Sequence, residues 1–348
     1  MATIYKFERR TFLKSAAAGA AFSGLAAPHV FAQGAQVPVR FTLNLPRNGT
    51  NSPFIHAMEK GYYAQEGIRI VSMDPAAGAD AMQRVASDTY DLGFGDLPAL
   101  AEWYLKNPDS TPLAIFNVYR STPAAIVSWK SAKIEKPADL VGRTVGGPLT
   151  DNAFRLFPVF FRANGLDPAG VRFNNVDLRL REAVFMRKEV DAVTGFDSTV
   201  WLNLRGLGVK FEDISIMLYS KHGLDLYSNS VIVSRKFLRE NEAMLPGFLR
   251  ATMKGWRDAA ADPAAVTESL FKADGLVNRD IERDRLKWIL ENQVMGPETA
   301  KSGLGQIEIP RLQKSIELLA RGLELPGVVA PDRIWSDKYL PALDQRRI

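Results

Sequence analysis

Short apolar runs alternate with amphipathic segments along most of the chain. After residue 51, Phe54, Met58 and Tyr62 recur at helical spacing, while Glu59 and Lys60 fall on another face. Strands that alternate with helices in this way are typical of parallel sheets. The apolar and β-branched runs predict strands at 37–45, 68–73, 92–94, 113–119, 124–129, 143–146, 171–176, 191–194, 214–218 and 231–234.

These elements form two βαβ units, followed by a helical tail at about 237–345. We therefore predict an α/β protein of two lobes, each a mostly parallel sheet flanked by helices, with a hinge between them. The tail is expected to pack on the first lobe. The chain should pass between the lobes near 128–134 and 227–231, so that 33–130 plus 231–348 form lobe 1 and 131–230 form lobe 2.

The two units contain a similar turn from a strand into a helix. Asp91-Leu-Gly-Phe-Gly-Asp96 precedes a helix in the first unit, and Asp191-Ala-Val-Thr-Gly-Phe-Asp197 precedes one in the second. Each ends in a glycine turn and an acidic residue that can cap the helix. If the turns face each other, a cleft forms between two helix N-termini, which carry partial positive charge. The alternative is that unrelated strand–helix turns look alike.

Residues 1–32 resemble an export signal. Arg9-Arg10 precede a weakly apolar run at 15–27, and Val30-Phe31-Ala32 suits a cleavage site after Ala32. The paired arginines followed by Phe-Leu-Lys resemble the twin-arginine signal, although Glu8 stands where that motif usually has Ser or Thr. An ordinary secretory signal is the alternative. We expect a periplasmic mature chain of about 33–348, exported by the twin-arginine machinery.

Composition and charge argue against several classes of protein. The chain contains no cysteine, which excludes disulfides, thiolate metal sites and cysteine nucleophiles. Its net charge is +5, but residues 1–32 contribute +3 of this, so the remainder carries only +2. A nucleic-acid-binding protein should concentrate basic charge in its folded part. No nucleic-acid partner is therefore expected.

Motifs for catalysis or metal binding are missing from the sequence. Of the three histidines, His29 falls in the leader, and His56 and His222 have no ligand at zinc-motif spacing. His56 is expected at the surface of the first helix. There is no G-x-x-x-x-G-K-[ST] loop, no G-x-S-x-G elbow and no isolated carboxylate pair for acid–base work. We predict no catalytic residue, no metal site and no cofactor.

Turn and cap residues at the predicted strand ends are the candidate ligand contacts, because α/β sheets hold small ligands at such edges. Polar caps and backbone N–H groups would bind the ligand's polar atoms, and aromatic side chains would cover its apolar face. Each cap could instead only cap its helix, and each aromatic could only pack in the core. The candidates are Asn51, Ser52, Gly78, Ala79, Asp80, Asp96, Leu97, Tyr119, Thr150, Asp151, Asn152, Phe196, Asp197, Ser198 and Tyr227.

The charge of the ligand stays open. Arg47, Arg120 and Arg155 lie near the predicted turns and could pair with an anion. Asp96 and Asp197 would instead suit amine or amino-pyrimidine groups, or could serve only their helices. The pattern slightly favours a small organic ligand with an anionic or aromatic group.

Several blocks together resemble the periplasmic solute-binding proteins of importers for nitrate, sulfonates, taurine and thiamine-precursor pyrimidines. They span about 40–260 and comprise a Ser52-Pro-Phe helix start, Ala57-Met-Glu-Lys-Gly-Tyr-Tyr-Ala-Gln-Glu-Gly-Ile68, Gly78-Ala-Asp-Ala81, 91–96, 136–146 and 231–238. The resemblance implies the type II periplasmic-binding-protein fold, which closes on its ligand by hinge bending. It also implies delivery of a small-molecule ligand to the permease of an ABC importer. We expect the protein to be a monomer.

Two other functions are weighed beside this one. The fungal enzyme that makes the thiamine pyrimidine shares the resemblance, and it relies on a catalytic histidine and a cysteine-rich, iron-associated motif. Here there is no cysteine, and Asn51-Ser52 occupies the turn where that histidine would be sought. We therefore expect a binding protein and not an enzyme. A ligand-sensing module that contacts a membrane receptor is the third possibility.

Overall fold

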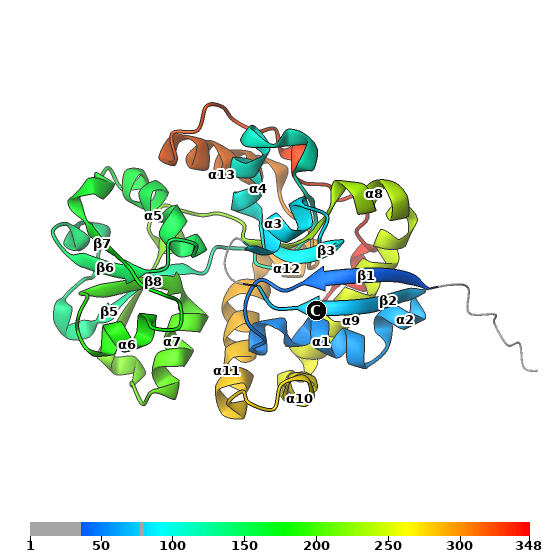
Figure 1. Cartoon of the computed structure of the whole chain (residues 1–348), viewed down its shortest axis with the longest axis horizontal. Coiled ribbons are helices and arrows are strands. Elements are labelled where there is room, and N and C mark those ends of the chain that lie inside the picture. Colours follow the sequence, from blue (N-terminus) through cyan, green and yellow to red (C-terminus); the bar gives the residue numbers. More distant parts are fainter. Residues whose placement is uncertain (1–35, 77–79) are drawn as a thin grey trace, which may run out of the picture. The chain divides into compact units, whose positions relative to one another are not determined.

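The computed structural model describes residues 36–76 and 80–348 (Figure 1). The predicted export signal at 1–32 and the candidate contacts Gly78 and Ala79 lie outside the described residues. None of the described helices is long and apolar enough to cross a lipid bilayer.

Sheet A consists of five strands in the order β2-β1-β3-β10-β4. The strands β2, β1 and β3 are parallel, and β10 runs antiparallel to its neighbours β3 and β4. Strand β10 therefore belongs to sheet A although it follows all the strands of the other sheet in the chain. The bounds are β1 Val37–Thr42, β2 Ile68–Asp74, β3 Leu92–Asp96, β4 Leu113–Asn117 and β10 Asn229–Val233.

Sheet B has the same pattern, in the order β7-β6-β8-β5-β9, with β5 as its antiparallel strand. The chain thus enters sheet B before β5, at 118–123, and not at 128–134 as expected. Periodicity could not decide this, because an apolar run does not show which sheet it joins. The bounds are β5 Ala124–Trp129, β6 Thr144–Gly147, β7 Arg172–Asn175, β8 Ala192–Phe196 and β9 Ile214–Leu218.

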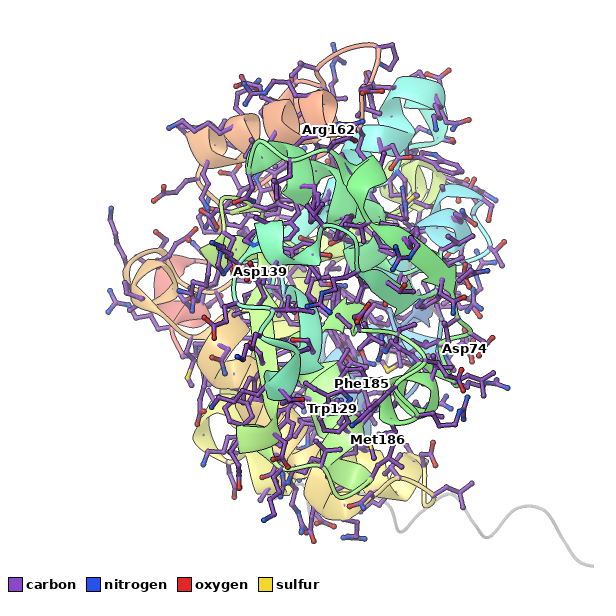
Figure 2. All side chains as sticks on the ribbon, turned by 90° about the vertical axis from the view of Figure 1, so that its left-hand side faces the viewer. Asp74, Trp129, Asp139, Arg162, Phe185 and Met186 are labelled. Atoms are coloured by element: carbon purple, nitrogen blue, oxygen red, sulfur yellow. The ribbon has the colours of Figure 1, made fainter. Side chains whose placement is uncertain are left out.

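Helices cover both faces of each sheet (Figure 1). An aromatic cluster joins sheet A to the helices on one face, with Phe41 5.2 Å from Phe54 and Phe54 5.8 Å from Trp256, measured between ring centroids. In sheet B, Trp129 of β5 stacks on Phe185 at 4.9 Å, and the two rings are nearly parallel (Figure 2). The helices up to residue 273 are α1 Ser52–Glu59, α2 Tyr62–Gln65, α3 Asp80–Ala86, α4 Leu97–Lys106, α5 Asn152–Ala163, α6 Arg181–Met186, α7 Asp197–Gly206, α8 Arg235–Asn241, α9 Leu245–Ala261 and α10 Pro263–Ala273.

His56 lies inside the helical layer, so the expectation that it is a surface residue is wrong. It is 4% exposed, because α9 and α10 pack over α1. Its Nδ1 lies 2.8 Å from the Ser269 hydroxyl, and its Nε2 lies 3.2 Å from the Asp258 carboxylate. None of the three residues lines the cavity described below, so this serine–histidine–aspartate cluster serves to join helices.

The last part of the tail contacts both sheets' cores and not only the first lobe. It comprises α11 Arg279–Ile289, a π-helical turn Leu290–Val294, α12 Pro297–Ser302 and α13 Ile309–Gly322. Leu286 of α11 belongs to the core of sheet A, while Ile281 of the same helix belongs to the core under α7. Helix α13 packs on both α4 and α5. The expected placement on the first lobe therefore holds for α9 and α10, whereas α11 and α13 bridge the two sheets.

Candidate functional site

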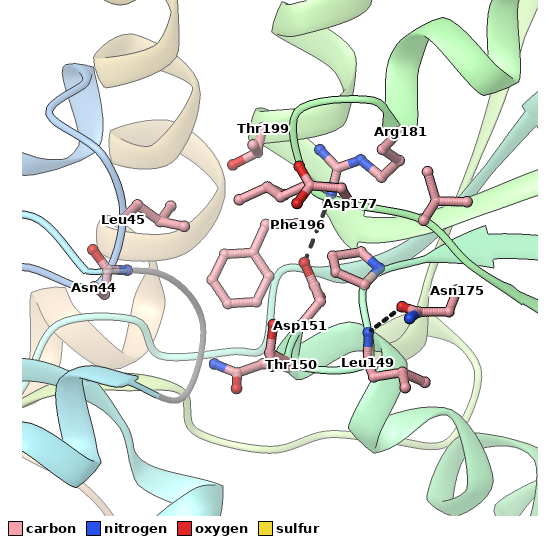
Figure 3. A pocket seen from close by; sticks show the side chains of 14 residues that line it. Asn44, Leu45, Leu149, Thr150, Asp151, Asn175, Asp177, Arg181, Phe196 and Thr199 are labelled. Atoms are coloured by element: carbon pink, nitrogen blue, oxygen red, sulfur yellow. Dashed lines mark hydrogen bonds and ion pairs between the residues drawn. The ribbon is translucent and has the colours of Figure 1, made fainter.

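A cavity of about 460 Å³ lies at the carboxyl ends of parallel strands from both sheets (Figure 3). Residues after β1 of sheet A face residues after β6, β7 and β8 of sheet B. This is the edge at which open α/β sheets bind ligands, and the volume is ordinary for a small-molecule site. The lining residues are Asn44, Leu45, Pro148, Leu149, Thr150, Asp151, Asn152, Asn175, Val176, Asp177, Leu178, Arg181, Phe196 and Thr199.

Among the described residues of this lining, Arg181 is the one basic residue, and its charge is already compensated. The side chain is fully buried, and its guanidinium donates to Glu182 Oε1 at 2.5 and 3.1 Å. Nη1 also donates to the Thr194 carbonyl at 3.3 Å and lies 3.7 Å from Asp151 Oδ2 (Figure 3). A buried arginine needs such partners, because an unpaired buried charge is very unfavourable.

Asp151, one of the predicted turn and cap residues, caps helix α5. Its Oδ1 accepts a hydrogen bond from the Ala153 N–H at 2.7 Å. Burial raises the pKa of Asp151, and the Arg181 guanidinium lowers it in part. The cap thus turns one carboxylate oxygen toward the helix and the other toward Arg181.

Asn44 is the most unusual polar residue of the lining. It is 4% exposed, and neither its Nδ2 nor its Oδ1 has a hydrogen-bond partner among residues 36–76 and 80–348. Thr199, on the opposite wall, has a buried Oγ1 that is likewise without a partner in the described part of the chain. Buried polar groups are normally paired, so these atoms point to a missing occupant of the cavity.

The structure brings together four of the predicted contacts at this cavity, Thr150, Asp151, Asn152 and Phe196. Asn51 and Ser52 lie elsewhere and do not cap α1 with their side chains. The Ser52 hydroxyl instead donates to the Gly49 carbonyl at 2.5 Å, because a 3-10 turn precedes the helix. Asp80, Asp96, Leu97, Tyr119, Asp197, Ser198 and Tyr227 are also outside the lining.

Asp96 and Asp197 are both engaged with protein groups. Asp96 Oδ1 accepts from the Ser228 hydroxyl at 2.9 Å. Asp197 accepts from the Ser198 N–H at 2.6 Å and from the Trp288 indole at 2.9 Å. Desolvation raises the pKa of each to about 6. Each carboxylate thus accepts at least one hydrogen bond from the protein itself.

The two strand–helix turns are equivalent in fold but offset by one residue. Asp96 is the last residue of β3 and stands opposite Asn229 of β10, whereas Phe196 is the last residue of β8 and stands opposite Ala124 of β5. Asp96 thus corresponds to Phe196, and Asp197 is the first residue of its helix. A shift of one residue along a strand turns the side chain to the other face. Phe196 therefore lines the cavity, whereas Asp197, one residue further along, does not.

The remaining aromatic candidates hold other parts of the fold. Tyr119 is buried among the aromatic side chains of sheet A, 5.5 Å from Phe94 between ring centroids. The Tyr227 hydroxyl donates to Glu298 at 2.5 Å and accepts from the Glu308 N–H at 2.9 Å. Burial raises the pKa of both tyrosines.

The three arginines that were candidates for pairing with an anionic ligand interact with other groups of the protein. Arg47 donates to the Met73 carbonyl at 2.8 Å, and Arg120 donates to the Met295 carbonyl at 3.0 Å. Arg155 pairs with Glu102. None of them lines the cavity, and Arg181, which does, was not singled out in the sequence.

Several lining residues that were not predicted share one feature, which is their position at or just beyond the end of a strand. Asn44 and Leu45 had been assigned to the first strand, but β1 ends at Thr42, so they lie just beyond its carboxyl end. Asn175 ends β7 in the same way. The rule that ligands lie at strand ends would have selected them if the boundaries had been right. Within 36–76 and 80–348, no three possible metal ligands gather around a common point.

The glycines of the two similar turns allow a matched prediction. A Cβ on Gly195 would collide with the buried Arg181 guanidinium and lie 2.5 Å from Val200 Cγ2, whereas one on Gly95 would lie 2.7 Å from the tip of Ile232. We expect Gly195→Ala to lower the free energy of unfolding by at least about 2 kcal/mol and Gly95→Ala by about 1 kcal/mol. Urea unfolding measures both, and equal losses would contradict the argument.

Fold and site together define a two-lobed α/β protein with a small-molecule cavity between its sheets. The chain matches the family model described as NMT1/THI5 like over residues 48–266, more than half its length, and it belongs to this family. The family expected from the sequence blocks is thereby confirmed.

Three relatives and one solved structure set the family context. The chain is 26% identical to the riboflavin-binding protein RibY of Chloroflexus aurantiacus over 91% of this chain and 90% of the relative. It is 26% identical to a formylaminopyrimidine-binding protein of Halalkalibacterium halodurans, covering 68% and 71%. A 4-amino-5-hydroxymethyl-2-methylpyrimidine phosphate synthase of Legionella pneumophila is 22% identical, covering 68% and 73%.

The solved structure is the periplasmic aliphatic sulphonate binding protein SsuA of Escherichia coli. It superposes with a TM-score of 0.63, covering 88% of this chain and 94% of that chain, at 16% sequence identity. At this identity the likeness concerns the fold alone. It confirms the predicted periplasmic-binding-protein fold.

Proposed function

We propose that this protein is an extracytoplasmic solute-binding protein that captures a small organic ligand between sheets A and B and delivers it to the permease of an ABC importer. The observation that carries the proposal is the cavity of about 460 Å³, which is lined from both sheets. Its lining includes buried polar atoms that have no hydrogen-bond partner in the described part of the chain. Enclosure between two lobes supplies binding energy, and the liganded state is the one that a transporter recognises.

The relatives suggest which ligands to test first. Two of them are named for binding riboflavin and formylaminopyrimidine, both nitrogen heterocycles. The apolar residues of the lining, among them Leu45, Val176 and Phe196, suit the face of such a ring. Riboflavin and a formylaminopyrimidine are therefore our first candidates.

Further parts of the proposal concern the route and state of the protein. Residues 1–32 would direct export through the twin-arginine machinery, and a monomer of about 33–348 would act in the periplasm. Lobe 1 would comprise 33–130 plus 231–348 and lobe 2 would comprise 131–230, except that β5 pairs within sheet B.

A ligand panel tests the proposal. The purified protein is titrated with riboflavin, a formylaminopyrimidine, uracil, ethanesulfonate and nitrate while its thermal unfolding is followed. A true ligand at a hundred times its Kd should stabilise the folded state by about 2.7 kcal/mol through mass action. Calorimetric titration then gives the stoichiometry, expected to be one per chain. No response to any compound would contradict the proposal.

Two assays separate the alternatives. Because one relative is named a synthase, an enzymatic function is the first alternative. Formation of a pyrimidine product from a pyridoxal-phosphate-like donor would overturn our choice of a binding protein. The absence of cysteine argues against the iron-associated chemistry expected for the fungal enzyme. Loss of ligand uptake after deletion of the neighbouring permease would support an importer over a sensor.

A further inference from the structure

We infer that Asn44 and Thr199 determine specificity at this cavity, and that the ligand is an uncharged planar heterocycle with an N–H donor beside a carbonyl acceptor. The inference rests on the proposed function, because it names the ligand class of the same site. The sequence pattern slightly favoured a ligand with an anionic or aromatic group. The inference instead specifies the hydrogen-bonding edge that the ligand presents to the site.

The side chain of Asn44 defines that edge. A carboxamide presents one acceptor and one donor group side by side, and the complementary partner is another amide-type edge. Both polar atoms are buried and unpartnered within the described residues. A buried polar group without a partner is costly, so an occupant that pairs with both atoms at once is strongly selected. Lactams and imides in heterocycles have this edge.

Thr199 supplies a second contact from the opposite sheet. It lies in the first turn of α7, and its buried Oγ1 has no hydrogen-bond partner in the described part of the chain. Asn44 follows β1 of sheet A, so a ligand that reaches both side chains joins the two sheets. Figure 3 shows both residues in the lining of the cavity.

The apolar part of the lining indicates a flat ligand. Phe196 is 8% exposed and lines the cavity together with Leu45, Pro148 and Val176. A ring system can place its apolar faces against such side chains while its polar edge meets Asn44. A small inorganic anion would leave these apolar contacts unused.

The charges of the lining disfavour an anion. The carboxylates are Asp151 and Asp177, and the single guanidinium is Arg181. Glu182 and Asp151 already compensate Arg181, so it offers no spare positive charge. An anionic ligand would meet carboxylates without a free cation, and like charges at close range cost binding energy. The ligand is therefore uncharged at the edge that enters the site.

The test uses two probes that differ by one N–H group. Riboflavin has an imide edge, and 3-methylriboflavin carries a methyl group where that edge has its donor. Binding of each to the purified protein is followed by flavin fluorescence. We expect the methyl compound to bind at least tenfold more weakly, because Asn44 Oδ1 then loses its donor. 1-Methyluracil against 1,3-dimethyluracil gives the same comparison for a smaller ring, because neither compound has an N1–H donor.

Two variants show which residue distinguishes riboflavin from the methyl compound. Asn44→Leu should weaken riboflavin binding at least tenfold and abolish the preference over the methyl compound. Thr199→Val should weaken both probes severalfold and keep the preference, while Thr89→Val, on an exposed residue outside the lining, should change neither. Asn44→Leu should leave the Tm of the free protein unchanged or higher, since it removes unpaired buried groups.

The possible outcomes separate the inference from the proposed function. Binding of ethanesulfonate or nitrate without riboflavin or uracil would overturn the ligand class and leave a solute-binding protein. A strongly lowered Tm of Asn44→Leu, with unchanged preference between the probes, would make Asn44 a structural residue and overturn its role. If no compound binds, the proposed function fails and the inference falls with it.

Discussion

Replacing Arg285 with methionine is expected to lower the free energy of unfolding by about 3–5 kcal/mol, the largest single-residue effect that we foresee. Arg285 of α11 is 2% exposed. Its guanidinium donates to the Ser198 carbonyl at 2.8 Å, to Asn203 Oδ1 at 3.0 Å and to Glu282 at 2.8 Å. Its removal leaves acceptors on α7 and a buried carboxylate without their donor.

The location of Arg285 gives this substitution an effect on the cavity as well. Glu282, its partner on α11, also accepts from the Gly49 N–H at 2.6 Å, so one ion pair fixes the segment between β1 and α1. Arg285 itself holds the start of α7, next to Thr199. The two walls of the cavity are thus tied to the same helix. We expect weaker ligand binding in any Arg285 variant that folds.

A matched control lies two residues away on the same helix. Arg283 forms partly exposed pairs with Glu268 and Asp280, and such surface pairs contribute little. Arg283→Met should therefore cost less than about 1 kcal/mol in urea unfolding. If Arg285→Met does not fold, Arg285→Lys remains informative, since one ammonium cannot replace the guanidinium's fork of donors. Equal losses for Arg283→Met and Arg285→Met would contradict the argument.

Asp96→Asn is expected to stabilise the protein at pH 8 and to leave its stability nearly unchanged at pH 4. Desolvation raises the pKa of Asp96 from 3.8 to about 6 in the folded protein. Between these values the folded state binds a proton that the unfolded state has lost, so this group's contribution to stability falls as pH rises. The full difference is about 3 kcal/mol and is reached above pH 6.

The amide can replace this carboxylate with little disturbance. Asn keeps the oxygen that accepts from Ser228, and it removes the charge that burial disfavours. Among the nearby charges, Arg155 lowers the pKa of Asp96 and Asp151 raises it, but both are smaller effects than desolvation. The measurement is urea unfolding of wild type and variant from pH 4 to pH 8. A difference that does not grow with pH would contradict the prediction.

Asp197→Asn provides the comparison. The pKa of Asp197 is also raised to about 6 by burial, but its two oxygens accept from the Ser198 N–H and the Trp288 indole. An amide would turn its NH₂ group toward one of these donors, and the resulting unpaired donors offset the gain from removing the charge. We therefore expect a smaller stabilisation at pH 8 than for Asp96→Asn.

Local patterns were sufficient to predict most of the fold. The strands β5 and β9 begin and end at the predicted residues, because each is an apolar run between turn residues. The helices α9 and α11 lie within the helical tail predicted at about 237–345. The cap at Asp151 was predictable for the same reason, since a cap depends on a few neighbouring residues.

The candidate site was only partly predictable. Phe196 and Asn152 were found because they lie at strand or helix ends that the sequence marks clearly. Asn44 was missed because the β-rich run continues three residues beyond the end of β1. Arg181 was missed because a buried arginine depends on partners that the chain brings to it, among them Asp151 and the Thr194 carbonyl.

The sequence by itself therefore determined the α/β class, the family blocks and the turns around which a site can form, because these depend on neighbours along the chain. Only the tertiary structure decided that β5 joins sheet B and that Asp96 corresponds to Phe196. It alone showed that α11 ties both walls of the cavity. Pairing, register and burial depend on residues far apart in sequence, and no local pattern contains them.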